Sequence, residues 1–536
     1  MTNSYDPHTM PDPSLIQRPI CDKIVTYDLS GDFSLPDYQP EIKRLLRIET
    51  SVLPPERYMS REHLDLSGSM DYFVLYTGND DQLYCAPLST DYQISIPLDD
   101  ERNGYDSMSS LSSEDITCTC HIAADPVTGR VTAPRRLNIK CRLTAKAKAY
   151  APVPVAATDS DTAGADTELL WGHIKSARLY QGVGEMLSLQ DDVILSPGDN
   201  REMRVVCAEG RVMVTETTSA MNMVTCRGDV LLKLTLCPTD PPDGELAAPV
   251  LMTRKIPFSQ AIDIAGVTPD CSSCAHGACS EMSVEVEEGQ LHADLGIILE
   301  VLAQKNQVTP YVKDIYSPQR ENDCIYATYP VEEALKCFNG NFTLSDSLPL
   351  SEVGISPAAR VIDVTATAFP ESIFVSQGKC VLTGRCRAHM ILSREGEYSS
   401  ASFELPFKYE SDSGLLATDL DSDSPITPDF DAEAQAVSCR ARMDGERVGI
   451  DAELAIMLRS VKKEEMTALS GVSYGEKVVR RCGEYVICFP APTDTLWTVA
   501  KRYHAPLAAL SAANNLPLPE AADKAGSLDG IDYLIV

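Results

Sequence analysis

The sequence predicts a mainly β protein with three repeated antiparallel β-sandwich-like domains and a small C-terminal βααβ domain. Three observations support this prediction. A long strand pattern with a central glycine occurs three times, the same flanking features recur around each copy, and roughly the last 50 residues follow a different pattern.

The repeated strand is centred on Gly68, Gly228 and Gly384. In all three copies, apolar residues stand two residues before the glycine and two, six and eight residues after it. This period of two is typical of a long, half-buried strand, and a glycine in its middle indicates a bulge, a bend or a close backbone approach. The glycines lie 160 and 156 residues apart, which indicates a domain-sized duplication. Turn residues between the strands favour an antiparallel sandwich or an open barrel.

The flanking features recur at matched distances. A leucine lies 33 or 34 residues before each glycine, an apolar-proline-apolar step lies 29, 29 and 22 residues after it, and a closing strand with alternating apolar residues ends each unit. The upstream residues are Leu35, Leu195 and Leu350, the prolines are Pro97, Pro257 and Pro406, and the closing strands begin at Leu137, Leu291 and Val448.

These features place the three domains at residues 20–150, 166–310 and 311–465. The Pro-, Ala-, Asp- and Thr-rich residues 151–168 are expected to link the first two domains, and residues 308–318 to link the last two. Smaller expected features are solvated loops at residues 99–115 and 411–431, and short helices at residues 40–46 and 331–337.

The C-terminal segment has its own pattern of elements. Residues 485–489 are predicted to form a strand, and Thr493 or Asp494 to cap a first helix. A second helix is predicted over residues 506–513, and a returning strand over residues 533–536.

Residues 483–536 resemble a LysM domain. The matching motifs are Thr493-Asp494-Thr495-Leu496-Trp497, Ala500-Lys501-Arg502-Tyr503 and Asn514-Asn515-Leu516. LysM domains bind N-acetylglucosamine polymers such as peptidoglycan in a shallow groove. The groove residues that the resemblance implies here are Asp494, Thr495, Leu496, Asn515, Leu516 and Pro517. Thr493 and His504 stand where the family usually has glycine.

The ligand of this groove can be a sugar or a protein. Thr493 adds a β-branched side chain where glycine would let a sugar approach the backbone. A protein interface needs apolar anchors, which Leu496, Trp497 and Leu516 could supply, although Trp497 also fits a role in helix packing. We therefore expect this segment to bind a protein more tightly than a chitin-type oligosaccharide.

The repeated units resemble the SPOCS domain of spore-forming Firmicutes. The matching stretches are SLPDYQPEIKRLLRIETSV, LSGSMDYFVLY and ISIPL in the first unit. Three such domains ahead of a LysM domain are the layout of a family of spore coat morphogenetic proteins. The resemblance implies a non-catalytic adaptor in the mother-cell cytoplasm, at the forespore surface, whose LysM domain docks on a SpoIVA-like ATPase of the coat basement layer. The alternative is a peptidoglycan-binding protein of the wall or cortex.

Composition argues against other function classes. The 46 Lys and Arg residues against 78 Asp and Glu residues give a net charge of −32, so nucleic acids and anionic membranes are not expected as partners. The start lacks a signal peptide pattern, and no stretch approaches ~18 apolar residues. We therefore expect a cytoplasmic protein without membrane insertion, with its 18 cysteines mostly reduced.

The candidate metal site of the sequence consists of Cys271, Cys274, His276 and Cys279, because zinc favours tetrahedral Cys and His ligands. Four ligands this close together rarely all reach one ion, so a surface loop with reduced thiols is the favoured interpretation. The acidic run at residues 419–424 lacks the glycine and glutamate of a calcium loop. The sequence has no phosphate-binding loop, nucleophile elbow or zinc-protease motif, so we expect no enzyme activity, metal or cofactor.

Overall fold

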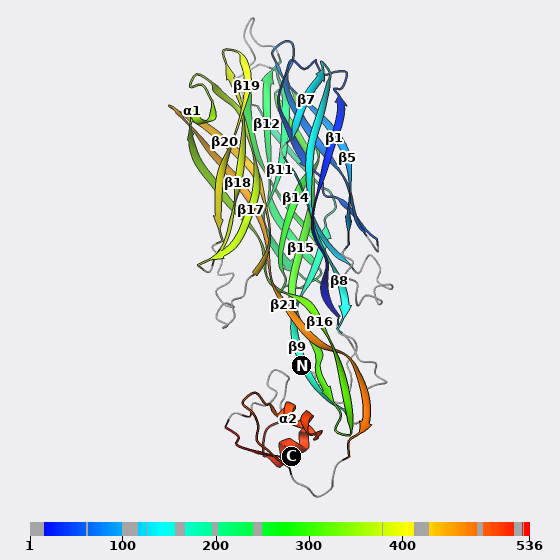
Figure 1. The fold of residues 1–536 in the computed structure, drawn as a ribbon. Coiled ribbons are helices and arrows are strands. Elements are labelled where there is room, and N and C mark those ends of the chain that lie inside the picture. The colour runs from blue at the N-terminus through cyan, green and yellow to red at the C-terminus, as the bar shows by residue number, and fades with distance from the viewer. Residues whose placement is uncertain are drawn as a thin grey trace.

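The protein is mainly β, with antiparallel sheets throughout and short helices near the C-terminus (Figure 1). A computed structural model describes most of the chain. The described residues are 15–60, 63–98, 116–125, 127–155, 167–195, 202–239, 249–377, 379–411, 428–479, 486–518, 528 and 530–536. The expected loop at 99–115, the calcium-like run at 419–424 and most of the expected loop at 411–431 lie outside these residues.

The first unit consists of two sheets that face each other over one core. In one sheet, β8 lies between β1 and the strands β6 and β7; in the other, β4 lies between β5 and the strands β2 and β3. Apolar side chains of both sheets form a common buried cluster. The bounds are Leu15–Ser34 (β1), Arg44–Val52 (β2), Glu56–Met59 (β3), His63–Thr77 (β4), Leu83–Pro97 (β5), Thr117–Ala124 (β6), Thr128–Ala133 (β7) and Arg136–Pro154 (β8).

The second unit repeats this arrangement. Strand β12 lies between β11 and β13 in one sheet, and β15 lies between β14 and the strands β9 and β10 in the other. The two sheets again enclose one buried cluster. The bounds are Glu168–Val183 (β9), Leu187–Ile194 (β10), Met203–Ala220 (β11), Met223–Pro238 (β12), Val250–Asp263 (β13), Ser272–Glu287 (β14) and Gln290–Tyr316 (β15).

The third unit has the same two sheets. Strand β18 lies between β17 and β19, and β21 lies between β16 and β20. A third buried cluster fills the space between them. The bounds are Arg320–Pro349 (β16), Leu350–Val353 (α1), Arg360–Ser376 (β17), Lys379–Arg394 (β18), Glu397–Glu410 (β19), Pro428–Asp444 (β20) and Arg447–Lys477 (β21).

The three predicted glycines occupy matching places at the centre of a sheet. Each glycine pairs with an aromatic residue of the neighbouring strand, and a Cβ atom on any of them would lie 2.5–2.9 Å from that side chain. The pairs are Gly68 with Tyr92, Gly228 with Phe258, and Gly384 with Phe407. Of the bulge, bend or close approach that the sequence left open, the structure shows a close approach.

The upstream leucines also match between units. The backbone N–H groups of Leu35, Leu195 and Leu350 each donate to a carbonyl oxygen at 2.9 Å. The acceptors are Arg135, Gly289 and Glu446, each two residues before the start of the predicted closing strand. This shared hydrogen bond joins the end of β1, β10 or β16 to the turn directly before the closing strand β8, β15 or β21.

Several details of the sequence prediction are wrong. Pro257 and Pro406 pair with the residue after their glycine, whereas Pro97 pairs with His63, five residues before Gly68, so the matched spacing of 29 in the first unit is coincidental. Neither segment expected to be a short helix is helical: residues 40–43 are irregular and residues 44–46 lie in β2, and residues 331–337 lie in β16. Pairing with a neighbouring strand overrides the weak helical spacing there.

The expected linker at residues 308–318 is also mostly strand. Strand β15 continues to Tyr316 and pairs with β9 up to that residue. Together with β9, β16 and β21, it extends beyond the paired sheets (Figure 1). This extension leads to the C-terminal module, residues 486–536, at one end of the molecule. In the described part of the chain, no helix has the length and apolar character needed to cross a bilayer.

Candidate functional site

The C-terminal module has two short helices beside a two-stranded antiparallel sheet. Its elements are Ile487–Cys488 (β22), Leu496–Arg502 (α2), Leu507–Ala513 (α3) and Leu534–Ile535 (β23), and β22 pairs with β23. This matches the predicted order of elements. The helix cap differs from the prediction: Thr495 accepts from the Thr498 N–H, while Asp494 accepts from the Ala491 N–H and from Arg502.

The predicted groove residues divide between surface and core. Asn515 and Pro517 are exposed, and Asp494, Thr495 and Leu516 are half-buried. Leu496 and Trp497 are buried, with exposed fractions of 1% and 2%. In this arrangement the last two are core residues and do not offer the exposed anchors that we expected.

Two residues at the turns of the module have left-handed backbone. His504 has φ 50° and Asn515 has φ 54°. Left-handed backbone is easiest for glycine and tolerable for asparagine, so His504 adopts a conformation that costs it more than it would cost a glycine.

Trp497 packs against the end of β15 instead of facing solvent. Its ring lies edge-on to Tyr316, with ring centroids 4.9 Å apart, and its indole N–H donates to the Asp314 carboxylate at 2.8 Å. Lys501 and Tyr326 donate to the other oxygen of Asp314 at 2.5 and 2.6 Å. Burial alone would raise the pKa of Asp314, but these hydrogen bonds lower it, so the carboxylate is charged at neutral pH.

Three further hydrogen bonds attach the module to the same place. The Tyr316 hydroxyl donates to the Ala505 carbonyl at 2.7 Å, and the Leu507 N–H donates to Glu168 at 3.2 Å. The His504 ring nitrogen Nδ1 lies 3.0 Å from the Ser317 carbonyl oxygen. We call the contact surface formed by Glu168, Asp314, Tyr316 and Ser317 the seat of the module.

The module's own sheet presents an apolar outer face. Cys488 and Leu534, which pair with each other, are buried against the helices. Their neighbours in the strands alternate outward, as a pleated strand requires. The outward side chains are Ile487, Phe489, Tyr533 and Ile535, with exposed fractions of 58%, 75%, 55% and 36%. We call these four residues the sheet face.

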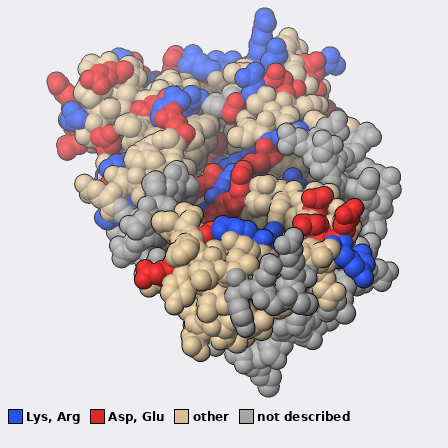
Figure 2. All heavy atoms as spheres, turned by 60° about the horizontal axis from the view of Figure 1, so that its bottom comes forward, with Lys and Arg blue, Asp and Glu red and all other residues tan. Residues whose placement is uncertain are grey.

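The sheet face was not among the site residues predicted from the sequence. The unbroken apolar run from Val486 to Phe489 could have indicated it. In a strand with one face in solvent, apolar residues would alternate with polar ones. Figure 2 brings this end of the molecule forward and shows many charged side chains in the upper half of the view and across its middle, whereas the described surface at the bottom of the view is mostly uncharged.

The three units meet around an equivalent β-bulge in each. Register shifts precede Arg47, Cys207 and Asp363, and each of these residues pairs with the residue seven positions after its unit's glycine. The bulged residues are Leu46, Val206 and Ile362, which share one buried cluster. A bulge changes the direction of a side chain, and here three bulges direct apolar side chains to a common contact.

Buried charges lie beside this cluster. The Arg47 side chain is 2% exposed and pairs with Asp363 and Glu209, each at 2.6 Å, and with Glu49 at 3.3 Å. Lys233 also pairs with Asp363. Burial would lower the pKa of Arg47, but the three carboxylates raise it. Burial would raise the pKa of Asp363, but Arg47 and Lys233 lower it. We call these five residues the junction, and they come from all three units.

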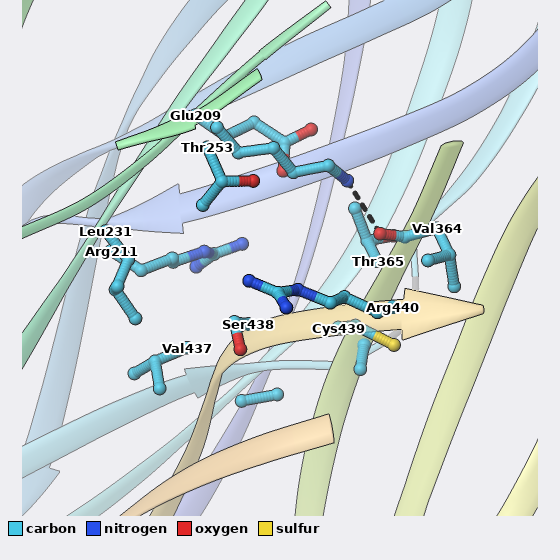
Figure 3. A pocket seen from close by; sticks show the side chains of 13 residues that line it. Glu209, Arg211, Leu231, Thr253, Val364, Thr365, Val437, Ser438, Cys439 and Arg440 are labelled. Carbon is cyan, nitrogen blue, oxygen red and sulfur yellow. Dashed lines mark hydrogen bonds between the residues drawn. The ribbon is translucent and has the colours of Figure 1, made fainter. Parts of the chain in front are cut away.

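A small pocket of about 40 Å³ lies beside the junction, between the second and third units (Figure 3). Lys233 donates to the Val364 carbonyl at 2.6 Å across it, and Arg211 and Arg440 extend toward each other from opposite sides. Burial raises the pKa of the Cys439 thiol to about 12, so this thiol is protonated at neutral pH. The charged groups Glu209 and Lys233 take part in contacts between units.

A second set of polar contacts joins the units farther along the central strands. Arg459 donates to Gln304 and to the Tyr150 hydroxyl, both at 2.9 Å, and to Glu332 at 3.2 Å. Tyr150 belongs to the first unit, Gln304 to the second, and Arg459 and Glu332 to the third. Each of these hydrogen bonds joins either two units or two strands of one sheet. The set therefore fits a structural role.

The cysteine-rich segment is not the loop that we favoured. It forms the start of β14, in which Cys274 is bonded to Cys337 of β16 by a disulfide with a Cα–Cα distance of 5.6 Å. His276 instead lies 3.4 Å from Glu300, and strand alternation directs Cys279 to the opposite face. The four predicted ligands therefore do not converge, and the disulfide is an exception to the expectation of reduced thiols.

No family model, curated protein or solved structure matches this chain.

Proposed function

We propose that this protein is a non-catalytic adaptor in spore coat or envelope assembly. In this proposal three SPOCS-like units form a scaffold, and the LysM-like C-terminal module docks on a SpoIVA-like ATPase of the coat basement layer. Docking takes place at the forespore surface, in the mother-cell cytoplasm. The proposal combines the two sequence resemblances with the surface of the module.

The exposed sheet face is the observation that carries the proposal. Its side chains are two isoleucines, a phenylalanine and a tyrosine, on a two-stranded antiparallel sheet. Aromatic and large aliphatic anchors of this kind provide most of the energy in protein interfaces. Trp497, the aromatic residue on which a sugar could stack, is engaged by Asp314 and Tyr316. A protein partner therefore fits the module better than a glycan.

The buried charges between the units support a scaffold role. Arg47 and Arg459 each contact residues of other units, and both side chains are almost inaccessible. Such groups are costly to separate, because each would leave unpaired buried charges behind. The three units would thus act as one body that places the module at its end.

The test is direct binding of the full-length chain to the purified coat basement ATPase. The double variant Ile487→Ser/Phe489→Ser should bind at least about tenfold more weakly, because two exposed anchors are lost. The matched control is Ile194→Ser, which alters a residue of the second unit that is 68% exposed. This control should bind like the wild type.

A parallel assay with purified peptidoglycan distinguishes the alternative. The proposal predicts weak sedimentation with peptidoglycan that the double variant does not change. It is contradicted if the chain binds peptidoglycan tightly, Asn515→Ala abolishes that binding, and the ATPase binds wild type and double variant equally.

A further inference from the structure

Two free thiols from different units lie in contact beside the junction. The Sγ atoms of Cys85 in β5 and Cys207 in β11 are 3.4 Å apart. Cys207 occupies the place in the second unit that Arg47 and Asp363 occupy in the other two. The thiol pair therefore lies where the first and second units meet, in the same buried cluster as the three bulged residues.

The strands that carry the two thiols are held together by independent contacts. Arg204 of β11 donates to the Leu83 carbonyl at 2.8 Å, and its guanidinium carbon lies 4.8 Å from the centre of the Tyr84 ring. These contacts involve residues directly beside Cys85 and close to Cys207 in the chain. They fix the separation of the two backbones and keep the sulfur atoms together.

The two thiols differ in access. Cys207 is buried, and Cys85 is half-buried, so a small molecule can reach Cys85 first. The contact with Cys85 and burial raise the pKa of Cys207, which makes it the slower nucleophile. This asymmetry suits an order in which Cys85 reacts with an oxidant and Cys207 then resolves the product.

The second and third units already show a covalent link of the same kind. Cys274 of the second unit and Cys337 of the third form a disulfide in the structure. Thiol pairs therefore lie within bonding reach at two separate boundaries, one between the first and second units and one between the second and third.

We propose that Cys85 and Cys207 form a reversible disulfide that locks the first unit to the second. A low-molecular-weight disulfide such as oxidised glutathione is the oxidant. The Cys85 thiolate attacks one sulfur of the oxidant and releases one small thiol, and the Cys207 thiolate then attacks Cys85 and releases the second. Two electrons and two protons pass from the protein to the oxidant, which becomes two thiols.

The disulfide between Cys85 and Cys207 would restrict the unfolded chain and keep the first and second units from separating. The two cysteines are 122 residues apart, so the bond closes a long loop in the unfolded state. In the chain-entropy model a loop of this size stabilises the folded state strongly. The oxidised protein should accordingly resist separation of β5 from β11.

The experiment uses the full-length chain and oxidised glutathione. After incubation, free thiols are alkylated under denaturing conditions, and the peptides are analysed by mass spectrometry without reduction. We expect a peptide pair joined through Cys85 and Cys207, which disappears on treatment with dithiothreitol. Cys85→Ala should abolish the pair, and Cys237→Ala, at a buried cysteine of the same cluster, should retain it.

Thermal unfolding gives a second readout that does not depend on the peptides. Oxidised wild type should unfold at least ~3 °C above oxidised Cys85→Ala, and the difference should vanish when both are reduced. The inference is overturned if Cys85 carries glutathione while Cys207 is alkylated, or if both thiols are alkylated. It is also overturned if the cross-linked protein shows no difference in midpoint from Cys85→Ala.

Discussion

The junction and the seat of the C-terminal module share one structural feature, but their charged groups differ in burial and in the number of charged partners. Each has one charged side chain directly after a β-bulge, Arg47 at the junction and Asp314 at the seat. The Arg47 side chain is 2% exposed and faces carboxylates from all three units. Asp314 is 19% exposed and faces Lys501, Trp497 and Tyr326.

The difference in burial and in charged partners indicates different roles for the junction and the seat. Removing Arg47 would leave several carboxylates together in a buried place, so the junction resists separation. Removing Asp314 would leave one lysine near solvent and one indole N–H without an acceptor, which is a smaller penalty. The three units should therefore behave as one body, and the module should be able to leave its seat without unfolding them.

The largest expected effect comes from Arg47→Met. Loss of the guanidinium leaves Asp363, Glu209 and Glu49 without their main partner, and we expect ~3–5 kcal/mol less free energy of unfolding in urea. The control is Arg385→Met, which removes an exposed pair with Glu371 and Glu404 and should change little. Equal effects of the two variants would refute the special role of the junction.

Asp314→Ala should have a smaller and more local effect. It removes the acceptor of Trp497 and Lys501, and a lost hydrogen bond to a charged group costs ~1.5–3 kcal/mol. Hydrogen exchange should increase in α2 and remain unchanged in β12. Tyr326→Phe, which removes one donor to the same carboxylate, should have a weaker effect. Increased exchange in β12 would show that the module and the units unfold together.

The free energy of unfolding at low pH gives a third test, which concerns a contact between the first and third units. Burial alone would raise the pKa of Asp431, but Lys148 and Lys146 lower it from 3.8 to about 2. Because the folded pKa is the lower one, the stabilisation is complete above the unfolded pKa and is lost as the pH falls toward 2. Wild type should lose ~2 kcal/mol more than Asp431→Asn between pH 5 and pH 2, measured by urea unfolding. Parallel pH profiles would contradict this.

The smallest effect on stability is expected on the sheet face. Phe489→Ser changes a side chain that is 75% exposed, and surface substitutions usually stay within ~0.5 kcal/mol. Thermal unfolding should therefore be unchanged, although we expect weaker binding to the proposed partner. A marked loss of stability would show that Phe489 packs against the module itself.

The sequence predicted features that depend on neighbours along the chain. The period-two strands around the three glycines and the order of elements in the C-terminal module agree with the structure. The sequence did not reveal the bulges at Leu46, Val206 and Ile362, because a bulge depends on the register between two strands. It also missed the link between Cys274 and Cys337, which depends on how two units pack.

The sequence indicated the C-terminal module as a separate unit, but it did not show which of its residues are exposed. The order of its elements was predicted, yet Leu496 and Trp497 proved to be core residues, and Tyr316 and Asp314 from another part of the chain contact Trp497. No local pattern could show this contact, since about 180 residues separate the two sides. The sheet face, in contrast, was visible as an uninterrupted apolar run and was interpreted only as a strand.

Hydrogen exchange of the full-length chain, with and without the purified coat basement ATPase, tests the central claim most directly. We expect binding to slow exchange in β22 and β23 and to leave exchange in the seat and the three units unchanged. Slower exchange confined to residues 494–496 and 515–517, or no change in the module at a concentration where the ATPase is bound, would contradict it.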